Sequence, residues 1–221
     1  MLRAIRRGSG LPVQLRPTDF AVLEREQTQR VATILAIDLS RSMGERGYLL
    51  GARRLALALL ALVRQRYPRD ILQVIGFSET ARRVQPQELP SLSWDRYGVG
   101  TNVQEALQFA RALLVPHKGM QRRIILITDG EPTAHRSSSG TLRFSQPPFP
   151  ETLSVTYAEA QRLRRDGVDL TTVVLSSSLH VVRFGQELAR HADGDLLVTD
   201  PNDLDAAIIV RYGRRSSPGR G

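Results

Sequence analysis

The sequence predicts an α/β fold with a doubly wound, mostly parallel central sheet, helices on both of its faces and one short antiparallel edge strand. Short apolar and β-branched runs alternate with longer segments of helical periodicity along the 221 residues, and this alternation is typical of such sheets. The runs are apolar throughout rather than at every second position, as expected of strands that are buried on both faces of a parallel sheet.

The first half of the chain supplies three strands and two helices. In order, we expect a strand at residues 31–37, a helix at 48–66, a strand at 71–77, a short edge strand at 81–84, a loop at 86–100 and a helix at 102–114. Tyr67-Pro68 ends the first helix, because proline cannot continue it. The loop is predicted from two prolines and two glycines, which interrupt regular structure.

The second half repeats the alternation with shorter strands. We expect a strand at 124–127, a long polar loop at 131–150, a helix at 151–166, a strand at 170–175, a helix at 180–192, a strand at 196–198 and a last helix at 203–210. Gly167 stops the helix that precedes it, since glycine favours the end of a helix. No internal repeat or change of composition marks a second domain.

The predicted domain therefore covers residues 30–210, between a basic N-terminal extension at 1–29 and a basic, disordered C-terminal tail at 211–221. The formal net charge of +9 lies mostly in these ends. Residues 1–16 and 211–221 each carry four arginines and no acidic residue, which leaves 23 basic and 22 acidic residues for the rest. Such ends can bind phosphate groups, but solvated, disordered ends are the commoner case and the one we expect.

No segment predicts a membrane span or a signal peptide. The longest strongly apolar run has nine residues, at 55–63, whereas a membrane-spanning helix needs about 20. The basic residues near the N-terminus are not followed by an apolar stretch. Cysteine is absent, which excludes disulfides and a thiolate zinc site and suits a cytoplasmic protein. We therefore expect a cytoplasmic location.

Oxygen-bearing side chains follow the ends of two predicted core strands. Asp38 ends one strand and Asp129 another, and parallel strands place such ends at the same edge of the sheet. Ser40 and Ser42 follow Asp38 at two-residue spacing, and Thr101 precedes a helix. A charge at the end of a buried strand costs desolvation unless it is compensated. Hard cations such as Mg²⁺ prefer oxygen ligands, so these five residues predict a metal site.

The set Asp38-x-Ser40-x-Ser42, Thr101 and Thr128-Asp129-Gly130 resembles the metal-ion-dependent adhesion site (MIDAS) of von Willebrand factor A (vWA) domains. The resemblance covers residues 30–210 and extends to the order of the motifs and their place at strand ends. It implies that Ser40, Ser42 and Thr101 contact the metal through hydroxyls. Asp38 and Asp129 would then bind it directly or through water.

The resemblance also implies a function. One Mg²⁺ or Mn²⁺ ion would bind an Asp or Glu carboxylate of a partner protein, so that the chain acts as a non-catalytic adaptor or regulatory subunit. Residues 129–133, Asp-Gly-Glu-Pro-Thr, resemble the intracellular branch of these domains, which includes magnesium chelatase D-subunit-type proteins and relatives that pair with AAA+ ATPases. An ATPase of that class is therefore one expected partner.

Specificity for the partner is expected from residues around the metal site. Aromatic and arginine side chains are frequent anchors of protein interfaces, and long loops at a site edge are often functional. The residues expected at this rim are Arg41, Trp94, Arg96, Tyr97, Glu131, His135 and Arg136. For the aromatic loop, packing against the domain itself is an equally good interpretation.

Other interpretations of the same residues are open. Aspartate, serine and threonine are common helix and turn caps, although five together favour a metal site. A metal-dependent hydrolase needs a general base, and His135 is the sole histidine near the predicted edge. No phosphate-binding Gly-x-x-x-x-Gly-Lys-Ser/Thr motif is present, so the chain is not expected to hydrolyse nucleotides alone. With Glu131 as the sole extra carboxylate near the edge, we do not expect an enzyme. In a further alternative the arginine-rich ends bind RNA or DNA, and the affinity should then fall steeply as the salt concentration rises.

Overall fold

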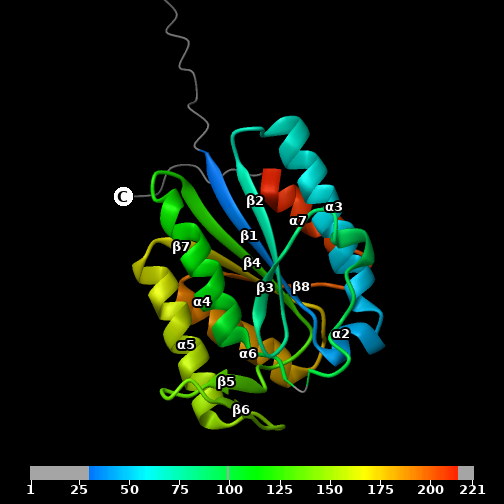
Figure 1. Ribbon diagram of the computed structural model, residues 1–221. Helices are drawn as coiled ribbons and strands as arrows, with labels where there is room; N and C mark the ends of the chain where they lie inside the picture. The colour runs from blue at the N-terminus through cyan, green and yellow to red at the C-terminus, as the bar shows by residue number, and fades with distance from the viewer. Residues whose placement is uncertain (1–29, 99, 214–221) are drawn as a thin grey trace, which may run out of the picture.

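The computed structural model describes residues 30–98 and 100–213 and confirms the predicted fold class. A six-stranded sheet has the order β3-β2-β1-β4-β7-β8, and helices cover both of its faces (Figure 1). All neighbouring strands are parallel except β2 and β3, so the predicted antiparallel edge strand is present. The strands are β1 (Val31–Asp38), β2 (Ile71–Phe77), β3 (Ala81–Val84), β4 (Gln121–Thr128), β7 (Val168–Val174) and β8 (Asp195–Val198).

Strand β1 is central, and all eight of its residues are buried. Its side chains alternate between two hydrophobic clusters, because successive residues of a strand point to opposite faces. Leu35 and Ile37 belong to the cluster on one face, and Ile34 and Ala36 belong to the cluster on the other. The continuous apolar run of the sequence therefore reflects two cores that share one strand.

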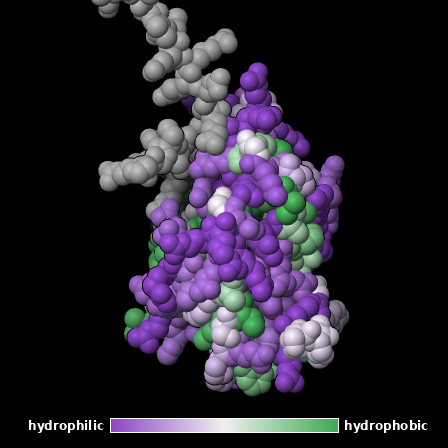
Figure 2. Space-filling model, turned by 90° about the vertical axis from the view of Figure 1, so that its left-hand side faces the viewer, coloured by the Kyte–Doolittle hydropathy of each residue, from purple (hydrophilic) through white to green (hydrophobic). Residues whose placement is uncertain are grey.

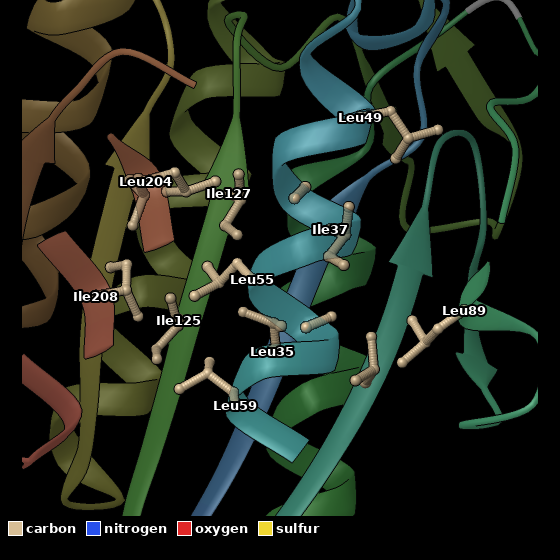
Figure 3. Close-up of a cluster of buried hydrophobic side chains, with 14 of the residues drawn as sticks. Leu35, Ile37, Leu49, Leu55, Leu59, Leu89, Ile125, Ile127, Leu204 and Ile208 are labelled. Carbon is tan, nitrogen blue, oxygen red and sulfur yellow. The ribbon is translucent and has the colours of Figure 1, made fainter. Parts of the chain in front are cut away.

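The first cluster lies between the sheet and the helices α3 (Tyr48–Arg66) and α7 (Leu204–Gly213). Figure 3 shows Leu55 and Leu59 of α3 beside Leu35 of β1 and Ile125 of β4. The second cluster lies on the opposite face under α4 (Val103–Leu114), α5 (Pro150–Arg165) and α6 (Leu179–Ala192). The outer surface over α4 and α5 is largely hydrophilic, with its few hydrophobic residues in small groups (Figure 2).

The structure differs from the sequence prediction in two connections. The expected loop at 131–150 contains a β-hairpin, β5 (Ala134–Arg136) and β6 (Leu142–Phe144), which pair in antiparallel fashion. These strands have three residues each, too short for their periodicity to be recognised. A short helix, α2 (Arg41–Glu45), was also not predicted. Two 3₁₀ turns, η2 (Leu89–Ser91) and η3 (Val115–His117), complete the described structure.

The structure describes only part of the two ends that the sequence predicts to flank the domain. Helix α7 continues to Gly213, three residues beyond the predicted end of the last helix at 210. The basic extension at 1–29 and residues 214–221 lie outside the described residues. Within the described part of the chain, no helix combines the length and the apolar character needed to cross a membrane.

Two leucines of α3 provide a test of the packing. Leu55 is fully buried in the first cluster, whereas Leu57 is 41% exposed. Leu55→Ala should lower the free energy of unfolding by about 2–5 kcal/mol, because it removes buried methyl groups and leaves a cavity. Leu57→Ala should lower it by less than about 1 kcal/mol. Urea denaturation measures both values, and equal losses would contradict the described orientation of α3.

Candidate metal site

The two predicted carboxylates lie at one edge of the sheet because β1 and β4 are parallel neighbours. Ile37 pairs with Ile127, so the strands end together. Asp38 is the last residue of β1, and Asp129 directly follows Thr128 at the end of β4. The Thr128 hydroxyl donates a hydrogen bond of 2.7 Å to Asp38 Oδ2. This contact joins the two strand ends across 90 residues of sequence.

The turn after β1 extends this contact into a network. The backbone N–H of Ser40 donates to Asp38 Oδ1 at 2.8 Å. The hydroxyls of Ser40 and Ser42 lie 3.2 Å apart. The Ser42 hydroxyl in turn donates to Asp129 Oδ1 at 2.7 Å. Four of the five predicted ligands therefore form one continuous hydrogen-bonded cluster.

The fifth predicted ligand, Thr101, is tied to the segment that follows Asp129. Its backbone N–H donates to the Thr133 hydroxyl at 2.9 Å, and its carbonyl accepts from the N–H groups of Thr133 and Ala134. Thr101 is buried just before α4, whose N-cap Asn102 accepts from the Glu105 N–H. The hairpin lies so close that a Cβ on Gly100 would stand 2.7 Å from that of Ala134. Glycine is therefore needed before Thr101.

Helix α2 connects the site to the core. Met43 is fully buried in the first cluster, one residue after Ser42. On another face, the Trp94 ring lies against Gly44, where a Cβ would be only 2.1 Å from ring atoms. The neighbours of Ser42 are thus packed, and this packing sets the position of its hydroxyl.

Asp95 organises the loop before Thr101, and the sequence analysis did not select it. Its Oδ1 accepts from the N–H groups of Tyr97 and Gly98, and its Oδ2 accepts from the Ser78 hydroxyl. Its own N–H donates to the carbonyl of Leu39 at 2.8 Å. The signal was available in the sequence, because an aspartate followed by a glycine three residues later is a common turn pattern.

Burial sets the electrostatics of the cluster. Burial, with a smaller contribution from the charge of Asp129, raises the pKa of Asp38 to about 7, although hydrogen bonds from Thr128 and Ser40 oppose the shift. Burial also raises the pKa of Asp129, against the hydrogen bond from Ser42 and the positive charge of Arg46. Both carboxylates therefore lack full compensation of their negative charge, and a nearby cation would supply it.

The donor set fits a hard divalent cation. It consists of carboxylate and hydroxyl oxygens, which Mg²⁺ and similar ions prefer. Among the described residues, no group of three or more His, Cys, Asp or Glu side chains is placed to hold a metal ion. An ion at this edge would therefore depend on the serine and threonine hydroxyls and on water in addition to the two aspartates.

Residues 31–213 match the family described as the vWA domain of Rv0959-like proteins. The chain belongs to this family. Protein Rv0959 of Mycobacterium tuberculosis and protein Mb0984 of Mycobacterium bovis are each 36% identical to it over 206 residues, or 91% of this chain. The chain spans about 30% of the length of these relatives.

Solved structures of other proteins share the fold of this vWA domain. The vWF domain of the pilus tip protein Mfa5 from Porphyromonas gingivalis has a TM-score of 0.63 at 14% identity, over 87% of this chain and 99% of that one. The pilus adhesin SpaC from Lactobacillus rhamnosus GG has a TM-score of 0.63 at 16% identity, over 85% and 30%. Proximal thread matrix protein 1 of the mussel byssus, with a zinc-occupied MIDAS motif, has a TM-score of 0.56 at 16% identity, over 82% and 47%.

The predicted rim of the vWA domain is exposed in one part and packed in another. Arg41 and Arg96 are exposed, and Tyr97 is 93% exposed. Trp94 is half-buried against Gly44, and the Arg96 guanidinium lies 5.6 Å from the centre of its ring. The interpretation of this loop as packed on the domain therefore holds for Trp94, while Tyr97 remains available at the surface.

The rim residues after β4 differ more from the prediction. His135 is fully buried, and its Nδ1 lies 2.9 Å from the Thr152 hydroxyl, so it is not part of the surface. The sequence placed it in a loop, whereas strand β5 turns it inward. The Arg136 guanidinium is paired with Glu105 at 2.6 Å. Glu131 is half-buried.

The raised pKa of Asp38 predicts that the vWA domain without a divalent ion loses stability between about pH 4 and about pH 7. In this range the unfolded carboxyl is ionised, since its ordinary pKa is 3.8, whereas the folded one still holds its proton. The folded state binds more protons, so the free energy of unfolding falls as the pH rises. Asp38→Asn should reduce the slope of the free energy of unfolding against pH. At about pH 8 this variant should be roughly 1–4 kcal/mol more stable than the wild type.

Urea denaturation in EDTA across this pH range measures the effect. Asp169→Asn is a suitable control, because Asp169 is exposed near the start of β7, away from the edge at which Asp38 and Asp129 lie. Its slope should match that of the wild type. Equal slopes for the wild type and Asp38→Asn would show that the carboxyl of Asp38 titrates in its ordinary range.

Proposed function

We propose that this vWA domain binds one divalent cation, Mg²⁺ or Mn²⁺, at the edge formed by Asp38 and Asp129, and through it binds a carboxylate of a partner protein. The observation that supports it most is the hydrogen-bonded cluster that joins Asp38, Ser40, Ser42 and Asp129. A cluster that only capped helices would not need two buried carboxylates, since burying charge without compensation is costly.

The proposed roles of the residues are those that the resemblance to the MIDAS implies. The hydroxyls of Ser40, Ser42 and Thr101 would bind the ion, and Asp38 and Asp129 would balance its charge directly or through water. The zinc-occupied MIDAS motif of the mussel protein supports a metal site in this fold. For this chain the oxygen-only donor set favours Mg²⁺ or Mn²⁺ over zinc. When bound, the ion supplies a coordination position that an acidic group of the partner can take.

The exposed side chains near this edge suit a partner whose acidic residue has apolar neighbours. Tyr97 is 93% exposed, and Phe144, which lies against Gly100, is 42% exposed. Arg41 and Arg96 add positive charge that attracts an acidic segment. Because residues 129–133 resemble intracellular vWA domains that pair with AAA+ ATPases, such an ATPase is the partner class to test first.

We propose a binding role rather than a catalytic one. A hydrolase would need a general base within hydrogen-bond reach of the substrate. His135, the histidine nearest the site in sequence, is buried against Thr152. The proposed role is that of an adaptor or regulatory subunit, and the location that we propose for it is the cytoplasm.

Metal binding should be visible as thermal stabilisation. Mg²⁺ or Mn²⁺ at about one hundred times its dissociation constant should stabilise the wild type by about 2.7 kcal/mol relative to EDTA. Asp129→Asn should lose most of this gain, because it removes one of the two charges that balance the ion. Differential scanning fluorimetry measures the rise in melting temperature that accompanies this stabilisation. Asp169→Asn is the control, and it should keep the rise. A wild type unaffected by millimolar ion would contradict the proposal.

The binding of a carboxylate to the metal ion can be tested separately. Bound Mn²⁺ accelerates the relaxation of water protons, and a ligand that takes the place of water reduces this effect. Acetate should therefore reduce the relaxation enhancement of the Mn²⁺-loaded protein, and neutral acetamide, which has a similar shape, should not. Equal effects of the two compounds would argue against the binding of a carboxylate at the ion.

A further inference from the structure

We infer that Arg46 is a built-in counter-cation of the candidate metal site and lowers its affinity for divalent ions. This inference rests on the proposed function. The Nη1 atom of Arg46 lies 3.2 Å from Asp129 Oδ2, while Asp129 Oδ1 accepts from the Ser42 hydroxyl. The guanidinium therefore contacts the carboxylate that would balance the ion.

Helix α2 explains why Arg46 reaches this position. The backbone N–H of Arg46 donates to the carbonyl of Ser42 at 3.0 Å, so the two residues are one helical turn apart. Residues four apart lie on the same face of a helix, and both Ser42 and Arg46 contact Asp129. The helix that carries a predicted ligand thus also positions the competing cation, at its C-cap.

The two partners of the ion pair differ in their access to water. The side chain of Asp129 is 0% exposed, whereas that of Arg46 is 53% exposed. The guanidinium can move into water at little cost, because about half of the Arg46 side chain is already exposed. The carboxylate has no such alternative, since its side chain is held at the end of β4 with no exposed surface. Arg46 is therefore the partner that leaves when a divalent ion approaches Asp129.

Two cations compete for one carboxylate in this arrangement. Without an ion, Arg46 compensates part of the charge of Asp129. Ion binding must break this pair and must also bring like charges close together, and both effects weaken it. The site is therefore tuned to release its ion more readily than the same oxygen ligands would without the arginine.

The test is the affinity of the full chain for Mn²⁺ alone, measured by calorimetry or by the spin-resonance signal of free Mn²⁺. Arg46→Gln should bind Mn²⁺ about three- to tenfold more tightly than the wild type at physiological salt. Arg46→Met keeps an unbranched apolar stem without the charge and should strengthen binding similarly. Agreement between two variants separates the loss of charge from a local packing defect.

Arg164→Gln is the matched control. The side chain of Arg164 is 60% exposed, close to the 53% of Arg46, and it also pairs with an aspartate, Asp193, at 3.6 Å. It lies near the end of α5, which leads into the start of β7, away from the edge at which Asp129 lies. The variant loses the same charge and should bind Mn²⁺ within about twofold of the wild type, because exposed charges beyond direct contact are screened by salt. In EDTA, Arg46→Gln should melt about 2–4 °C below Arg164→Gln, because the buried Asp129 loses its partner.

The outcomes separate the inference from the proposed function. If the wild type binds Mn²⁺ and the Arg46 variants bind it equally or more weakly, Arg46 does not compete with the ion, while the proposed metal site stands. If neither the wild type nor any variant binds Mn²⁺, both the metal site and the role of Arg46 are overturned. Tighter binding by Arg46→Gln and Arg46→Met, but not by Arg164→Gln, supports the inference.

Discussion

The buried negative charge at the ends of β1 and β4 is the constraint on which the rest of the site depends. Asp38 is fully buried, and two hydrogen bonds, from Ser40 and Thr128, compensate it only in part. A second carboxylate, Asp129, lies beside it and raises its pKa further. Two such groups at one edge favour a positive charge nearby, and Arg46 supplies one in this structure.

The loops around this edge depend on one another. Asp95 links the end of β1, through Leu39, to the end of β2, through Ser78. Thr101 is linked to the hairpin after β4 through Thr133 and Ala134. These connections give the loops a defined arrangement without regular secondary structure. Preorganisation of this kind reduces the entropy lost when a ligand binds.

Helix α2 combines several functions in five residues. It packs through Met43, accommodates Trp94 at Gly44, directs Ser42 toward Asp129 and is followed directly by Arg46. A change in this helix would therefore alter packing, hydrogen bonding and charge at the site together. The spacing of Ser42 and Arg46, one helical turn, brings a hydroxyl and a positive charge to the same carboxylate, that of Asp129.

The sequence by itself determined the layered sheet and the meeting of Asp38, Ser40, Ser42 and Asp129. Continuous apolar runs are strong local signals, and parallel strands must end at a common edge, so residues after Ile37 and Ile127 had to come together. Only the tertiary structure decided the hairpin at 134–144, the burial of His135 and the pairing of Arg46 with Asp129. These features depend on contacts between distant segments, 83 residues apart for Arg46 and Asp129. Local pattern carries no signal for such contacts, because the partner of a polar side chain is set by how the loops pack.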